Sequence, residues 1–194
     1  MPLASKRLTW LIGWRSRCRR ALMQWRSCAN STIAKTLKAK LMLTHDFKEF
    51  AELLNLNQVE YLVVGGYALA AYGHPRYTGD LDFWVGTAPA NADRVLAALS
   101  QFGFDGMDIG KQDLTKPNSV IQLGYPPRRI DLLTSIDGVD FAQCYQRRLV
   151  IKLDGFDLSF IALEDFKTNK RATGRHKDMA DLEAIEKINR PLDT

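Results

Sequence analysis

The chain has 194 residues, of which 46% are hydrophobic and 25% charged, so it is long enough for one substantial core and ordinary for a globular protein. It contains no apolar run of about 18 residues, and we expect no membrane-spanning helix. Its three scattered cysteines, Cys18, Cys28 and Cys144, fit neither a disulfide framework nor a zinc site. They favour a reducing compartment, and we expect a cytoplasmic protein.

Charge divides the chain in two. Residues 1–41 contain ten Lys and Arg and no acid, whereas residues 42–194 contain 17 Lys and Arg against 22 Asp and Glu. We therefore separate a basic N-terminal extension, 1–41, from a mildly acidic domain, 42–194. The extension is either a disordered or upstream segment, or an amphipathic helix that binds an anionic membrane surface or nucleic acid.

From Met42 onward, helix and strand patterns alternate. A first helix is capped by Thr44 or Asp46, and residues 103–117 are expected to form a loop. The other expected elements are strands at 60–64, 81–85, 119–123, 129–133, 149–153 and 156–161, and helices at 67–72, 90–102, 163–172 and 175–188. This order predicts an α/β (α+β) fold, with a single small mixed sheet flanked by helices and a C-terminal helix pair.

Two carboxylates stand two residues apart in the second expected strand. Because side chains alternate along a strand, Asp80 and Asp82 leave the same face, while Leu81 points to the core. Two like charges side by side repel each other unless a cation lies between them. Oxygen ligands of this kind suit Mg²⁺ or Mn²⁺, although an Asp-x-Asp pair alone is common in surface loops.

The surroundings of this pair strengthen the metal hypothesis. The first strand ends at Gly65-Gly66, where the backbone can approach a phosphate closely, and a helix begins directly afterwards. The chain then returns to the two acids. A third acid, Asp131, lies in a short apolar strand, where a carboxylate is costly unless it is paired or bound to metal. The alternative for Asp131 is an edge strand on which it faces water.

These motifs together resemble those of the DNA polymerase β-type nucleotidyltransferase superfamily. The resemblance rests on Gly65-Gly66, the Asp80-x-Asp82 pair and Asp131 on a later strand. Within the superfamily, residues 64–69, 76–82 and 170–181 are similar to motifs of the AbiEii-type small bacterial nucleotidyltransferases. The likeness covers about residues 44–188 and leaves out the basic extension. It implies the nucleotidyltransferase fold.

The resemblance also implies an activity, which is Mg²⁺-dependent transfer of a nucleoside monophosphate from an NTP such as ATP to an acceptor hydroxyl. Asp80, Asp82 and Asp131 would be the catalytic metal ligands for two Mg²⁺ ions, with Mn²⁺ as a substitute, and Gly65 and Gly66 would contact the phosphates. The acceptor would be RNA, for instance a tRNA end, or a protein, in a toxin–antitoxin or phage-defence setting with a cognate antitoxin. The alternatives are a catalytically idle binding protein of this fold and a small-molecule nucleotidyltransferase of the aminoglycoside-modifying type.

Three further residues are candidates for nucleotide binding. Arg76 and Thr78 precede the acid pair, and each either positions phosphate or fixes the loop beside the acids. Lys170 either contacts phosphate or belongs to a solvated helix face. Asp178 and Asp181 share one face of the last helix, and we expect them to hold the helix pair together.

Overall fold

A computed structural model describes residues 43–105, 108–153 and 155–188. In this part of the chain, six strands form one mixed sheet that is accompanied by seven helices. The predicted mixed α/β class with a single sheet and a C-terminal helix pair is therefore confirmed. The nucleotidyltransferase fold itself stays a prediction of the resemblance. Both interpretations of residues 1–41 lie outside the described residues.

The elements alternate along the chain in the predicted order. The helices are α2 (His45–Leu56), α3 (Gly65–Ala71), α4 (Pro89–Gln101), α5 (Lys111–Thr115), α6 (Phe141–Arg147), α7 (Leu163–Thr173) and α8 (His176–Ile188). The strands are β1 (Tyr61–Val63), β2 (Asp80–Val85), β3 (Val120–Leu123), β4 (Arg129–Leu133), β5 (Leu149–Leu153) and β6 (Phe156–Phe160). None of the helices in the described ranges combines the length and apolarity that a bilayer crossing requires.

The strands lie in the order β3-β4-β2-β1-β6-β5. Strand β2 runs parallel to β4 and antiparallel to β1, and β1 runs parallel to β6. The outer pairs, β3 with β4 and β5 with β6, are antiparallel. Strand β4 therefore lies between two neighbours, and the edge-strand alternative for Asp131 is wrong.

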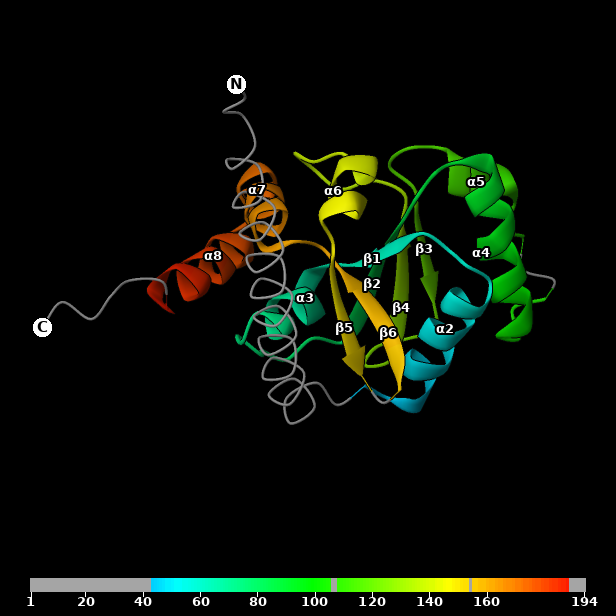
Figure 1. Cartoon of the computed structure of the whole chain (residues 1–194), viewed down its shortest axis with the longest axis horizontal. Coiled ribbons are helices and arrows are strands. Elements are labelled where there is room, and N and C mark those ends of the chain that lie inside the picture. Colours follow the sequence, from blue (N-terminus) through cyan, green and yellow to red (C-terminus); the bar gives the residue numbers. More distant parts are fainter. Residues whose placement is uncertain (1–42, 106–107, 154, 189–194) are drawn as a thin grey trace, which may run out of the picture.

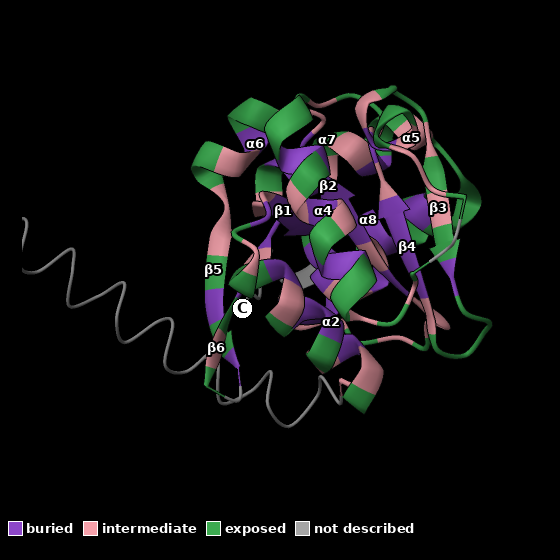
Figure 2. Cartoon of the chain, turned by 90° about the vertical axis from the view of Figure 1, so that its right-hand side faces the viewer, coloured by how far each residue is buried: buried purple, intermediate pink, exposed green. Residues whose placement is uncertain are grey.

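Helices cover the sheet on both sides. In Figure 1, α2, α4 and α5 lie on one side of the strands, and α7 and α8 lie on the other. Figure 2, seen from the side of α2 and α4, places these two helices in front of the strands and α7 and α8 behind them. The buried residues gather between the helices and the sheet in this view.

Alternation along β2 decides which side chains enter this core. Leu81, Phe83 and Val85 are almost fully buried, as the period of two predicts. Phe83 packs at an angle to Phe50 of α2, with ring centroids 5.7 Å apart. The opposite face of β2 carries Asp80, Asp82 and Trp84. Phe141 of α6 covers Trp84, with 5.1 Å between the two ring centroids.

Two short helices depart from the predicted elements. The expected loop 103–117 contains α5, whose Leu114 is fully buried. Helix α6 begins after Asp140, whose carboxylate accepts a hydrogen bond from the Gln143 backbone N–H at 3.0 Å. Neither helix is long enough to repeat an apolar face twice, so periodicity gave no signal.

Candidate metal centre

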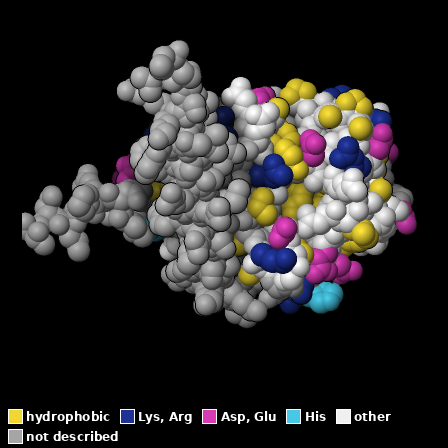
Figure 3. Space-filling view, in the orientation of Figure 1, with side chains coloured by type: hydrophobic (Ala, Val, Ile, Leu, Met, Phe, Trp, Pro, Cys, Tyr) yellow, Lys and Arg dark blue, Asp and Glu magenta, His cyan; other side chains and the backbone are white. Residues whose placement is uncertain are grey.

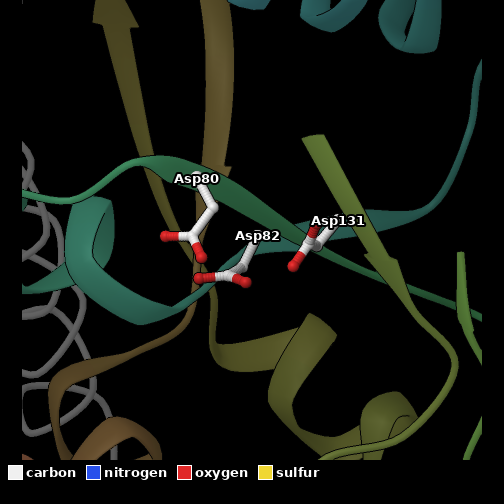
Figure 4. A group of neighbouring side chains, drawn as sticks. All are labelled: Asp80, Asp82 and Asp131. Atoms are coloured by element: carbon white, nitrogen blue, oxygen red, sulfur yellow. The ribbon is translucent and has the colours of Figure 1, made fainter. Parts of the chain in front are cut away.

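Strand pairing brings the three predicted acids together. In the parallel register of β2 and β4, Asp82 lies opposite Asp131, and Asp80 lies opposite Arg129. The three carboxylates come within 4.8 Å of one another. Figure 4 shows their side chains leaving the two strands toward the same side of the sheet. The structure thus assembles an all-oxygen group that can hold a metal ion.

Arg129 neutralises two of these acids. Its Nε donates to Asp131 at 2.6 Å, and its Nη2 donates to Asp131 at 2.8 Å and to Asp80 at 2.9 Å. Such charge-assisted contacts from one guanidinium are strong and directional. Asp131 is only 5% exposed, so its charge needs this partner.

Asp82 is the acid that Arg129 leaves unpaired. In the described residues, no group donates a hydrogen bond to its carboxylate, which lies directly against Gly65. Burial, together with the nearby charges of Asp80 and Asp131, raises its pKa from 3.8 to about 6. A carboxylate in this situation gains more than its neighbours from a bound cation.

The glycine pair makes room for the acids. Gly65 has a φ of +64°, and a side chain there would collide with the Asp82 carboxylate. A Cβ on Gly66 would come within 2.9 Å of the Thr78 Cβ. The Thr78 hydroxyl in turn donates to Asp80 at 2.6 Å. The absence of a side chain at Gly65 and Gly66 therefore lets Asp82 and Thr78, respectively, approach the start of α3. Contact of the two glycines with phosphate stays a prediction.

The carboxylates form part of a cleft of about 500 Å³. Another wall of the cleft comes from α7, α8 and the link between them, and it carries Lys170, Arg175 and Lys177. In all, five acidic and five basic residues line this cleft: Asp80, Asp82, Asp131, Asp137 and Asp178, with Arg76, Arg129, Lys170, Arg175 and Lys177. On the face shown in Figure 3, by contrast, charged side chains are scattered over the described surface.

A buried ion network joins this basic wall to the loop before β2. Lys170 is 5% exposed, and its ammonium contacts both Asp178 and Asp181. Arg76 binds Asp181 through two hydrogen bonds, at 2.8 and 3.0 Å, and Arg175 binds Asp178 at 2.6 Å. Burial alone would raise the pKa values of both aspartates, but these hydrogen bonds hold them below the usual value.

The network bears on several predicted roles. Asp178 and Asp181 join α8 to Lys170 of α7, in the structural role expected for them. Arg76 fixes its loop to α8, and Thr78 fixes Asp80. Lys170 lines the cleft, but its ammonium is already held by two carboxylates, so a solvated helix face is the wrong interpretation. Its contact with nucleotide phosphate stays a prediction.

The donor set fits a hard divalent cation. Among the described residues the grouped ligands are all carboxylate oxygens, which Mg²⁺ and Mn²⁺ prefer, and none of these residues donates a hydrogen bond to the Asp82 carboxylate. The residue that the sequence interpretation missed is Arg129. A signal was present, because Arg129 stands two residues before Asp131 and so shares its face of β4. Its contact with Asp80 depends on the strand pairing, which the sequence does not state.

No protein-family model and no curated protein matches this sequence.

The first prediction concerns Gly65. Gly65→Ala forces a strained positive φ and pushes the Cβ into the Asp82 carboxylate, so we expect lower stability and weaker Mn²⁺ binding. Gly73→Ala is the matched control, because Gly73 has a φ of +94° but no atom within 4 Å of the added Cβ. It should lose about 1–2 kcal/mol of stability through backbone strain and keep its Mn²⁺ affinity. Denaturant unfolding and Mn²⁺ titration measure both effects, and equal Mn²⁺ affinities would contradict the explanation.

The second prediction concerns the pH dependence of Asp82. A folded-state pKa of about 6, above the ordinary 3.8, means that ionised Asp82 destabilises the metal-free fold increasingly from pH 4 to 6 and fully above that range. Asp82→Asn should therefore stabilise the protein in chelator by roughly 2–3 kcal/mol at neutral pH. The gain should vanish near pH 4. Denaturant unfolding across this range tests it, with Asp157→Asn, an exposed strand aspartate outside the cleft, as control. A gain in stability that does not change with pH would show that the pKa of Asp82 is not raised in the folded protein.

The third prediction concerns Arg129. Arg129→Gln leaves the neighbouring carboxylates of Asp80 and Asp131 without their cation, so we expect this variant to be less stable than the wild type in the presence of a chelator. Mn²⁺ should raise the melting temperature of this variant more than that of the wild type. Arg147→Gln is the control, because it breaks a similar pair of hydrogen bonds to Asp165 outside the cleft. Mn²⁺ should not restore the stability that this variant loses. If Mn²⁺ stabilises Arg129→Gln and wild type equally, Arg129 does not take the place of a cation.

Proposed function

We propose that this protein is a divalent-metal-dependent nucleotidyltransferase, which moves a nucleoside monophosphate from an NTP to an acceptor hydroxyl. One observation carries the proposal. Three carboxylates on paired strands share a cleft of about 500 Å³ with the basic wall formed by α7, α8 and the link between them. The carboxylates suit a metal ion, and the cations suit the phosphates of its nucleotide.

The reaction needs little covalent chemistry from the protein. The acceptor hydroxyl oxygen forms a bond to the α-phosphorus, the bond to the bridging oxygen breaks, and pyrophosphate leaves. The hydroxyl proton passes to water or to a carboxylate of the centre. A divalent cation held by Asp80, Asp82 and Asp131 would stabilise negative charge on the attacking and leaving oxygens.

Other cleft residues position the carboxylates and supply positive charge. Thr78 holds the Asp80 carboxylate through a hydrogen bond, and Gly65 leaves the space that the Asp82 carboxylate fills. Lys177 is exposed on the basic wall, and Arg175 keeps its side chain 71% exposed while it contacts Asp178. These two cations are better placed than the buried Lys170 to reach a triphosphate. Lys170 orients the wall through Asp178 and Asp181.

A second candidate function is nucleotide or metal binding without turnover. It is favoured by Arg129, which neutralises Asp80 and Asp131 without any metal. A fold that satisfies its own acids in this way can persist after catalysis is lost. The small-molecule acceptor, the toxin–antitoxin or phage-defence setting and the cognate antitoxin stay predictions of the resemblance.

The test is a transfer assay on the full chain. The protein is incubated with each α-labelled NTP, Mg²⁺ or Mn²⁺ and total RNA or lysate, and label in the acceptor is measured. We expect transfer that chelator abolishes and that Asp80→Ala, Asp82→Ala and Asp131→Ala each reduce at least about 100-fold, because each loses a metal ligand.

The control for this assay is Asp157→Asn, which removes an exposed carboxylate from the same sheet and should leave transfer unchanged. Absence of transfer with every NTP would overturn the proposed function. Calorimetry would then separate the second candidate, because a non-catalytic binder still takes up NTP without releasing pyrophosphate.

A further inference from the structure

Two exposed tyrosines lie on loops that lead directly into the metal centre. Tyr77 is 84% exposed in the loop before β2, and Tyr125 is 87% exposed in the turn before β4. They are the most exposed large hydrophobic side chains of the described residues. Asp80 and Arg129 begin the strands that these two loops enter. Each loop therefore carries a tyrosine a few residues before the first metal-centre residue of the strand that follows.

The two loops lie against each other. The Arg129 backbone N–H donates to the Gly79 carbonyl at 3.3 Å. A Cβ on Gly79 would stand 3.7 Å from the Pro127 Cα and 3.8 Å from the Pro126 Cβ. From these contacts and the length of the intervening chain, the Cα atoms of the two tyrosines are at most about 18 Å apart. Both tyrosines therefore lie at the same end of the sheet.

Charge separates these loops from the rest of the domain. Residues 73–79 and 124–128 contain His74, Arg76 and Arg128 but no acid, whereas residues 42–194 as a whole carry five more acids than bases. Arg76 is engaged by Asp181, but Arg128 is exposed. Exposed aromatic rings beside an exposed guanidinium favour a partner that has both flat rings and negative charge.

We propose that Tyr77 and Tyr125 stack on bases of a single-stranded RNA acceptor, whose phosphate backbone Arg128 contacts. This inference rests on the proposed function and names the acceptor class of the same site. Unpaired bases expose faces on which tyrosine stacks with little dependence on sequence. Bases inside a duplex do not offer these faces, so the platform selects single strands. A strand bound there would present its terminal hydroxyl to the carboxylates at the start of β2 and β4.

The test is RNA binding by the full chain, measured by fluorescence anisotropy with a short labelled oligoadenylate and with a duplex of equal length. Tyr77→Ala and Tyr125→Ala should each weaken single-strand binding about 10-fold and leave duplex binding unchanged. Tyr77→Trp and Tyr125→Trp should retain or strengthen it, because the ring is kept. High salt weakens charge-driven contacts to phosphate, so the ten Lys and Arg of residues 1–41 do not obscure the stacking difference.

Two control variants test whether the effect is local. Leu56→Ala removes a side chain that is 73% exposed on α2, and Arg94→Gln removes a cation on α4, away from these loops. Both should bind oligoadenylate like the wild type, whereas Arg128→Gln should bind more weakly and show a smaller salt dependence. A 2-aminopurine base in the oligonucleotide should be quenched by the wild type and not by the double alanine variant.

The outcomes keep this inference apart from the proposed function. Binding is measured without NTP or metal, so absence of nucleotidyl transfer would leave a tyrosine-dependent affinity in place. If both alanine variants bind oligoadenylate as the wild type does, the platform is refuted, even where transfer depends on Asp80. A loss of affinity for a protein partner with unchanged RNA binding would likewise overturn it and assign the tyrosines to a protein interface.

Discussion

The parallel pairing of β2 with β4 is the constraint on which the cleft depends. Its register places Asp82 opposite Asp131 and Asp80 opposite Arg129, so three negative charges and one positive charge share a small area of one sheet face. A slip of one residue in either strand would turn that strand's acids into the core and its buried apolar side chains outward. The fully buried Leu81 and Leu132 oppose such a slip, because apolar burial and charge placement require the same register.

Electrostatic compensation in the cleft is incomplete, and this incompleteness gives the site its chemistry. Arg129 satisfies Asp80 and Asp131, while the network of Arg76, Lys170 and Arg175 satisfies Asp178 and Asp181. Asp82 remains without a hydrogen-bond donor among the described residues, and its pKa is raised. The fold therefore holds its acids in position at a cost in stability that a bound cation would relieve.

Patterns that repeat along the chain predicted most of the fold and part of the site. The period of two in β2 placed Asp80 and Asp82 on one face, and the cost of a carboxylate in an apolar strand marked Asp131. Helices α5 and α6 were missed because they are too short to show a repeat. The buried position of Lys170 and the bridging role of Arg129 depend on partners from other elements, Asp181 and Asp80, and no local pattern in the sequence encodes those contacts.

The Arg76–Asp181 pair also makes the last helix part of the centre, although 105 positions separate the two residues along the chain. A shortened protein that ends before α8 would keep every carboxylate of the triad and yet leave Arg76 and Lys170 without their counter-charges. The loop that carries Thr78 would then lose its ion pair with α8, and the unpaired, buried ammonium of Lys170 would destabilise the fold. The C-terminal helix is thus a structural support of the site, although it supplies none of the three metal-centre carboxylates.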